Sequence, residues 1–151
     1  FRRPLMFENI RLKLQARQYE IAHDAASEAT VGQPEAPMGF YLRGEARRRM
    51  AEDPKGAARE HAWLYDVDDD EALEARMAAQ RDTWLDDAGQ DFATARRLDP
   101  GFWLALRGQG LVALAQGESA QARESLSAYL SHVPEARDRL YIEHLIQGVE
   151  P

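Results

Sequence analysis

Cysteine is absent from the 151-residue sequence, so disulfides, thiolate zinc sites and a cysteine nucleophile are all excluded. Long apolar runs are also missing, because no stretch approaches the roughly 18 apolar residues that a membrane-spanning helix requires. We therefore expect no membrane insertion. The opening residues, Phe1-Arg2-Arg3-Pro4, lack the charged-then-apolar layout of a signal peptide. Because the first residue is not Met, we expect a processed form or a part of a longer protein.

Basic residues are outnumbered, with 19 Lys and Arg against 26 Asp and Glu, which gives a net charge of −7. A nucleic-acid-binding protein normally carries a broad basic surface, so we expect no nucleic-acid partner. Helix breakers are scarce as well, with 10 Gly and 7 Pro against 25 Ala. Alanine has the highest helix propensity of all residues. The composition therefore predicts a single all-α domain.

The breakers that do occur are regularly placed. They separate segments of roughly 10 to 15 residues in which apolar residues recur at spacings of three and four, as in amphipathic helices. Short links between such helices favour antiparallel helical hairpins. The breaks fall at residues 32–37, Asp53 to Gly56, residues 66–71, Asp99 to Gly101, Gly117 to Ser119, and Val133-Pro134.

The segment from Gly101 to Pro134 resembles a tetratricopeptide repeat (TPR), a helix-turn-helix unit whose period is about 34 residues. The resemblance rests on six positions of that motif, occupied here by Leu106, Gly110, Gly117, Ala122, Leu126 and Pro134. Two positions depart from it, because Tyr129 replaces the usual Ala and Gln109 the usual Leu. The resemblance implies helical hairpins that stack into a right-handed superhelix.

Weaker units of the same type precede this one. We predict units at about residues 3–36, 39–68, 69–100 and 101–134, followed by a capping helix at 135–148, all within one domain of residues 1–151. The stretch from Asp69 to Arg97 contains no strong break. Whether it forms one helix or two stays open at this point.

TPR arrays bind proteins or peptides in a concave groove lined by the first helix of each unit. The resemblance therefore implies a non-catalytic binding scaffold, and it assigns groove positions residue by residue: Phe7, Arg11, Phe40, Arg43, Arg47, Leu73, Met77, Arg107 and Leu111. Arginines beside apolar residues suit an acidic or C-terminal peptide segment, since guanidinium groups pair with carboxylates. The alternative is that Arg43, Arg47 and Arg107 are solvated and cover apolar surface with their stems.

No pattern in the sequence indicates catalysis, a metal site or a cofactor. The acidic run from Asp66 to Glu71 lacks the Gly and Glu that a calcium loop needs, and a helix starting near Asp69 explains it better. The four histidines form no H-E-x-x-H motif. Trp63, Trp84 and Trp103 are interpreted as packing residues.

Two other interpretations remain. The end of the chain, from Tyr129-Leu130 through Pro134-Glu135-Ala136 to Glu143, resembles the TPR tails of bacterial zinc metalloproteases that police envelope protein assembly. The chain would then be an accessory C-terminal region, in either the periplasm or the cytoplasm of a bacterium. Alternatively, an apolar first unit without a cap could pack against another copy of the chain, which predicts a homo-oligomer.

Overall fold

The computed structural model describes residues 2–149, and these form nine α-helices and no strand. The all-α prediction is therefore confirmed for this part of the chain, whereas residues 1, 150 and 151 of the predicted domain lie outside it. The helices are α1 (Arg2–Gln15), α2 (Tyr19–Gly32), α3 (Pro37–Glu52), α4 (Pro54–Tyr65), α5 (Glu71–Ala79), α6 (Arg81–Leu98), α7 (Trp103–Ala115), α8 (Ser119–His132) and α9 (Arg139–Gln147).

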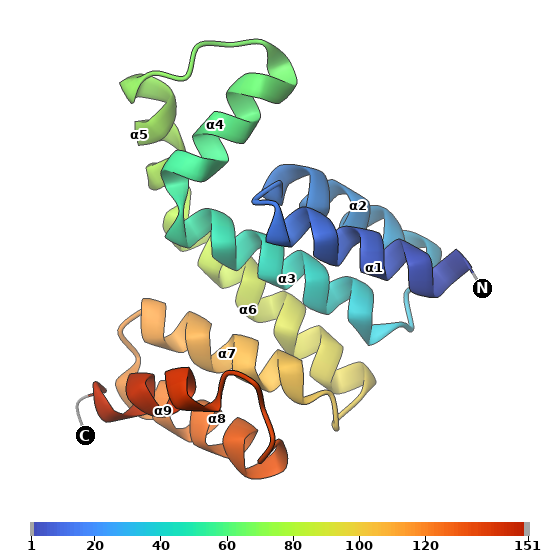
Figure 1. Cartoon of the computed structure of the whole chain (residues 1–151), viewed down its shortest axis with the longest axis vertical. Coiled ribbons are helices and arrows are strands. Elements are labelled where there is room, and N and C mark those ends of the chain that lie inside the picture. Colours follow the sequence, from blue (N-terminus) through green and yellow to red (C-terminus); the bar gives the residue numbers. More distant parts are fainter. Residues whose placement is uncertain (1, 150–151) are drawn as a thin grey trace.

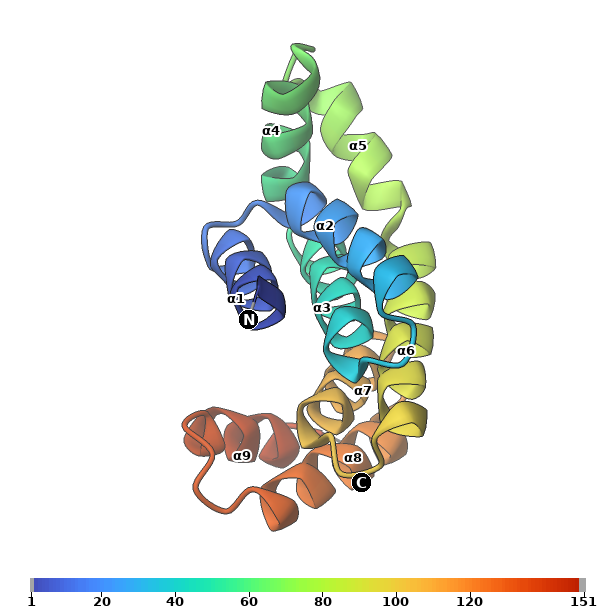
Figure 2. The ribbon, with the colours of Figure 1, turned by 90° about the vertical axis from the view of Figure 1, so that its right-hand side faces the viewer.

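Three antiparallel helix pairs stack into a curved array (Figures 1 and 2). The pairs are α1 with α2, α3 with α6, and α7 with α8. Helices α1, α3 and α7 touch one another along one side of the array, and α2 and α6 also pack onto the pair that follows. Helix α9 folds back beside α8. The array is therefore concave on the side of α1, α3, α7 and α9.

The first and last pairs have the same turn between their two helices. Between α1 and α2, Arg17 adopts a left-handed conformation (φ 61°), and the amide of Gln18 donates to the Lys13 carbonyl at 2.9 Å. Between α7 and α8, Gly117 takes that place (φ 76°), and the amide of Glu118 donates to the Ala113 carbonyl at 2.9 Å. Glycine accepts this conformation without strain, whereas arginine does so at some cost.

The three pairs also end alike. The amides of Gln33, Asp99 and Val133 each donate to the carbonyl four residues earlier, and each of these residues precedes a proline. A proline after a helix prevents its continuation. The interval from Gln33 to Asp99 is almost twice as long as the interval from Asp99 to Val133. The middle pair therefore contains an insertion.

The inserted residues form hairpin α4–α5, which projects from the array between α3 and α6 (Figure 1). The helices consequently pair differently from the predicted units 39–68 and 69–100, since α3 packs on α6 and α4 packs chiefly on α5. The stretch from Asp69 to Arg97 is two helices, interrupted at Gln80. The acidic run caps the second helix of the hairpin as expected, because Asp70 accepts the amide of Leu73 at 2.9 Å.

Glycines allow the pairs to pack closely. The fully buried Phe92 ring of α6 enters between α3 and α7, where a methyl group on Gly44 or Gly108 would lie 2.7 Å or 2.6 Å from it. Leu126 of α8 rests on Gly110 in the same way, at 2.7 Å. Side chains at these glycines would overlap the neighbouring helix, so the close packing depends on them.

No helix among the described residues is both long and apolar enough to cross a membrane.

Candidate functional site

A pocket of about 210 Å³ lies in the middle of the concave side. Its walls come from three helices: Arg11, Leu14 and Gln15 of α1, Tyr41, Leu42, Glu45 and Arg49 of α3, and Leu104 of α7. The pocket therefore combines apolar and charged groups from all three helix pairs. It exists because the first helices of successive pairs lie side by side.

Glu45 is the charged centre beneath the pocket. Its side chain is buried, and both carboxylate oxygens accept hydrogen bonds from Arg48, at 3.1 Å from Nε and 2.9 Å from a terminal nitrogen. Arg49 adds a third bond at 3.3 Å, and Arg48 also pairs with Glu52 at 2.9 Å. Burial raises the pKa of Glu45, but the opposing effect of Arg48 and Arg49 is larger and lowers it to about 2. Glu45 is consequently a carboxylate at neutral pH.

Tyr41 stands between this carboxylate and the core. Its ring packs on Phe92 and Phe102, with centroid distances of 5.9 Å and 5.4 Å. Burial, followed by the negative charge of Glu45, raises the pKa of the Tyr41 hydroxyl above its usual value. The hydroxyl therefore stays protonated and can donate a hydrogen bond.

Asp138, just before α9, closes the concave side at its other end. One of its oxygens accepts a 2.6 Å bond from Arg107 Nε, and the other accepts a 2.9 Å bond from the Tyr129 hydroxyl. Burial and this bond raise the pKa of Tyr129 to about 12. Burial opposes the charge of Arg107, but Glu45 and Asp138 outweigh it and raise the Arg107 pKa. Arg107 is thus already paired with a carboxylate.

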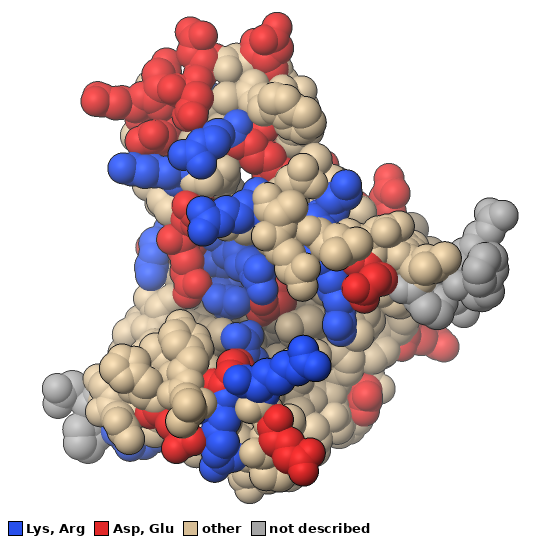
Figure 3. All heavy atoms as spheres, viewed as in Figure 1, with Lys and Arg blue, Asp and Glu red and all other residues tan. Residues whose placement is uncertain are grey.

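Arginine is in excess over this side of the molecule. Figure 3 shows Lys and Arg gathered over its middle, whereas Asp and Glu crowd the tip of hairpin α4–α5. Within the described residues Arg11 has no carboxylate partner, and a terminal nitrogen lies 3.9 Å from Met38 Sδ. Arg49 is 37% exposed and bonds to Glu45 through Nε only. An incoming anion would therefore find two guanidinium groups that are not saturated.

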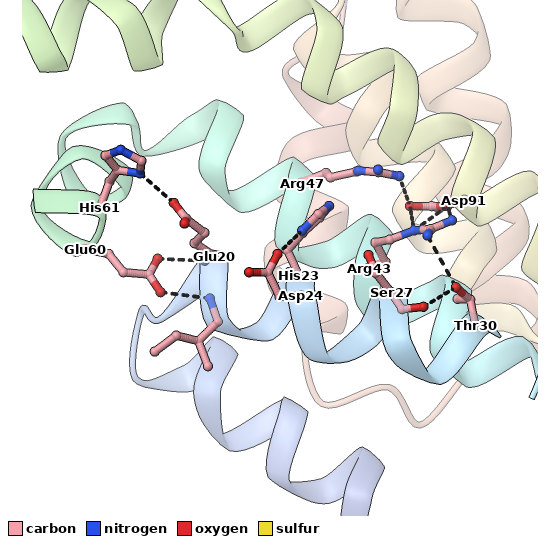
Figure 4. A network of polar contacts seen from close by, with 11 residues as sticks. Glu20, His23, Asp24, Ser27, Thr30, Arg43, Arg47, Glu60, His61 and Asp91 are labelled. Atoms are coloured by element: carbon pink, nitrogen blue, oxygen red, sulfur yellow. Dashed lines mark hydrogen bonds and ion pairs between the residues drawn. The ribbon is translucent and has the colours of Figure 1, made fainter. Parts of the chain in front are cut away.

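Arg43 and Arg47, both predicted to face the groove, lie elsewhere. They converge on Asp91 of α6, a carboxylate that is only 4% exposed (Figure 4). Arg43 reaches it at 2.9 Å and Arg47 at 2.7 Å, and Arg43 also lies 3.4 Å from the Thr30 hydroxyl. These two arginines connect α2, α3 and α6. Their charges are used within the fold.

The apolar members of the predicted groove are divided between core and surface. Leu73 and Met77 of α5 and Leu111 of α7 are buried, at 4%, 8% and 5% exposure, so they present almost no surface to a ligand. Leu111 is covered because it packs with Ile142 of α9. The other two, Phe7 and Phe40, are partly buried against the main core. Among the nine predicted residues, only Arg11 lines the pocket itself.

The predicted set does not include Tyr41, Glu45 or Arg49, because the register assumed for the middle unit is shifted by two residues. The repeated prolines would have corrected it. Tyr41 and Arg107 each follow such a proline, Pro34 or Pro100, by seven residues. The counterpart of Arg107 in α3 is therefore Tyr41, where the register of the predicted 39–68 unit assigned Arg43.

A second polar cluster fastens the inserted hairpin to the array (Figure 4). Glu60 of α4 accepts the amides of Glu20 and Ile21, at 2.7 Å and 3.0 Å, and so caps the start of α2. His61 bonds to the Glu20 carboxylate at 2.9 Å. Burial raises the pKa of Glu60, although its backbone bonds partly oppose this. The cluster holds two helices together and opens onto no pocket lined by these three side chains.

Across the described residues, no group of three or more His, Asp and Glu side chains is arranged to hold a metal ion. Comparison with protein-family models, with curated proteins and with solved structures found no match. The resemblance to TPR proteins, and that to the metalloprotease tails, therefore stay predictions.

Proposed function

We propose that this chain is a non-catalytic scaffold that binds a protein through an acidic or C-terminal peptide segment. The segment would lie on the concave side, with its carboxylate at Arg11 and Arg49. The observation that carries the proposal is the pocket between α1, α3 and α7, in which these two unsaturated arginines stand beside apolar side chains. Binding by such an array is a fold-level analogy, so the argument rests on the pocket.

The chemistry of the pocket favours a carboxylate over other groups. Guanidinium groups bind carboxylates through paired charge-assisted hydrogen bonds. The protonated Tyr41 hydroxyl supplies a further donor. Leu14, Leu42 and Leu104 form an apolar wall that a leucine-sized or aromatic side chain next to the carboxylate would cover.

The arrangement of the helices supports the same proposal. The interval between the ends of the last two pairs, from Asp99 to Val133, equals the length of one tetratricopeptide repeat. In such arrays the first helices form an extended concave surface, and here α1, α3 and α7 hold this position. The basic middle of an otherwise acidic chain would attract an acidic segment and repel a basic one.

The proposal is tested with a library of random decapeptides that have free C termini, selected on the wild-type chain. An enriched peptide is then measured by fluorescence polarisation. We expect Arg11→Glu/Arg49→Glu to weaken binding by at least about tenfold. The matched control Arg59→Glu, an exposed arginine on α4, should bind like the wild type. Amidation of the peptide C terminus distinguishes a terminal carboxylate from an acidic side chain.

Two results would contradict the proposal. One is a library that yields no enriched peptide on the folded wild-type chain. The other is a set of peptides that bind the double variant and the wild type equally well, because the arginines of the pocket would then have no role.

A further inference from the structure

The two ends of the array differ in how they are covered. At the end formed by α7 and α8, helix α9 packs on the last pair and its Ile142 is completely buried. At the other end, Leu5 and Leu12 of α1 are 54% and 51% exposed. They lie seven residues apart and therefore on one face of the helix. Repeat arrays need a polar surface at their ends, which makes this apolar face unusual.

The same face is buried in both of the other pairs. The shared turn at Arg17 and Gly117, together with the repeated prolines, identifies the counterparts of Leu5 and Leu12 in the later first helices. All four counterparts are buried: Gly39 and Ala46 in α3, and Ala105 and Val112 in α7.

In each case the second helix of the preceding pair covers them. Helix α2 lies over α3, where a methyl group on Gly39 would be 3.4 Å from Thr30 Cγ2. Helix α6 lies over α7, where a methyl group on Gly89 would be 3.8 Å from Val112 Cγ1. Among the described residues, no helix precedes α1 and covers its face in this way.

The uncovered face continues into a groove between α1 and α2. This groove has a volume of about 340 Å³, and it is lined by Leu5, Met6, Asn9, Ile10, Lys13, Ile21 and Ala25. Its counterpart in the last pair is more polar, because Gln121 and Ser125 replace Ile21 and Ala25. The groove at the open end is thus suited to apolar side chains, although the rest of the surface is strongly charged.

We propose that this end face, formed by α1 and the adjoining groove, binds the same face of a second copy of the chain. The pattern along α1 is complementary to itself. If two α1 helices cross antiparallel about a two-fold axis between Glu8 and Asn9, then Leu5 meets Leu12 of the second copy. Glu8 then meets Asn9 of the second copy, so a carboxylate faces a carboxamide donor. A two-fold contact of this isologous kind is the commonest form of protein self-association.

The contact extends over one helix of 14 residues and its groove, which is small for a stable dimer. We therefore expect a dissociation constant on the order of 10–100 µM. The dimer would leave the pocket of the concave side open, because Arg11, Tyr41 and Leu104 belong to a different face. Self-association and peptide binding are consequently independent, and each can fail without the other.

Sedimentation velocity over a range from about 5 to 500 µM tests the dimer. The weight-average sedimentation coefficient of the wild type should rise with concentration, whereas Leu5→Glu/Leu12→Glu should stay monomeric. Both leucines are exposed, so the variant keeps its fold, which circular dichroism checks. The matched control Leu140→Glu replaces an 83% exposed leucine of α9 and should dimerise like the wild type.

The register is tested by disulfide trapping, for which the absence of cysteine is an advantage. An oxidised mixture of Leu5→Cys and Leu12→Cys chains should give cross-linked heterodimer, and each variant alone should give far less dimer. The proposal is overturned by a wild type that stays monomeric at every concentration, which would leave the face to a helix of another protein. Cross-links only between identical positions would also overturn it, since they require a parallel contact.

Discussion

Helix α3 carries two arginine clusters on different faces, and they differ in how far their charges are satisfied. Towards α6, Arg43 and Arg47 share the buried carboxylate of Asp91. Towards the pocket, Glu45 is matched chiefly by Arg48, which leaves Arg49 and its neighbour Arg11 with free donors. Both clusters hold two or more arginines close together. The position of the carboxylates, and not the number of arginines, decides which cluster can accept a ligand.

Removal of the buried carboxylate on the pocket side should have the largest effect. In Glu45→Ala, Arg48 keeps only its bond to Glu52 and remains buried. We expect the free energy of unfolding to fall by about 3–5 kcal/mol, as measured by urea denaturation. A loss below about 1 kcal/mol would mean that Arg48 reaches solvent easily.

The carboxylate of the other cluster should matter somewhat less. In Asp91→Ala, the side chains of Arg43 and Arg47 can turn towards water, since both are already 20% exposed. We expect a loss of about 2–3 kcal/mol in the same urea measurement. If this loss exceeds that of Glu45→Ala, the ranking of the two clusters by burial is wrong.

Acid should weaken the pocket cluster in a defined range. The folded-state pKa of Glu45 is about 2, below the value of 4.5 expected when unfolded. Its contribution is therefore complete above pH 4.5 and is lost as the pH falls towards 2. Between pH 5 and 3 we expect a loss on the order of 1–2 kcal/mol from this group. Stability against pH should be flatter by this amount in Glu45→Gln.

The smallest expected effect on stability comes from Asp138, which is 26% exposed. Asp138→Ala should cost about 1 kcal/mol, because Arg107 and Tyr129 can be solvated when their shared acceptor is removed. The same change leaves Arg107 without a carboxylate on the concave side. An acidic peptide selected on the wild type should then bind more tightly to the variant in fluorescence polarisation. Weaker binding would place Asp138 among the groups that contact the peptide.

Much of the fold could be predicted from local patterns. Pro37, Pro54 and Asp70 stand at helix starts, and Gly117 stands at the turn between α7 and α8. These signals act within a few residues, so they are readable without a structure. The strongest repeat, residues 101–134, coincides with pair α7–α8 and its flanking turns.

The candidate site was only partly predictable. Arg11 and Arg107 were placed on the concave side, but Arg43 and Arg47 were not, because an insertion in the middle pair obscured the register. Sequence also could not indicate that Leu111 lies under α9. Burial of that kind depends on a helix that follows much later in the chain.

The sequence by itself determined the helical character, the helix ends and the excess of acid. Each of these depends on propensity, capping or a charge count, which involve neighbouring residues or none. Only the tertiary structure decided that α3 pairs with α6 across an inserted hairpin, and which arginines meet a carboxylate. Those outcomes depend on contacts between residues far apart in the sequence, such as Arg43 with Asp91. Contacts of that range arise from the packing of whole helices.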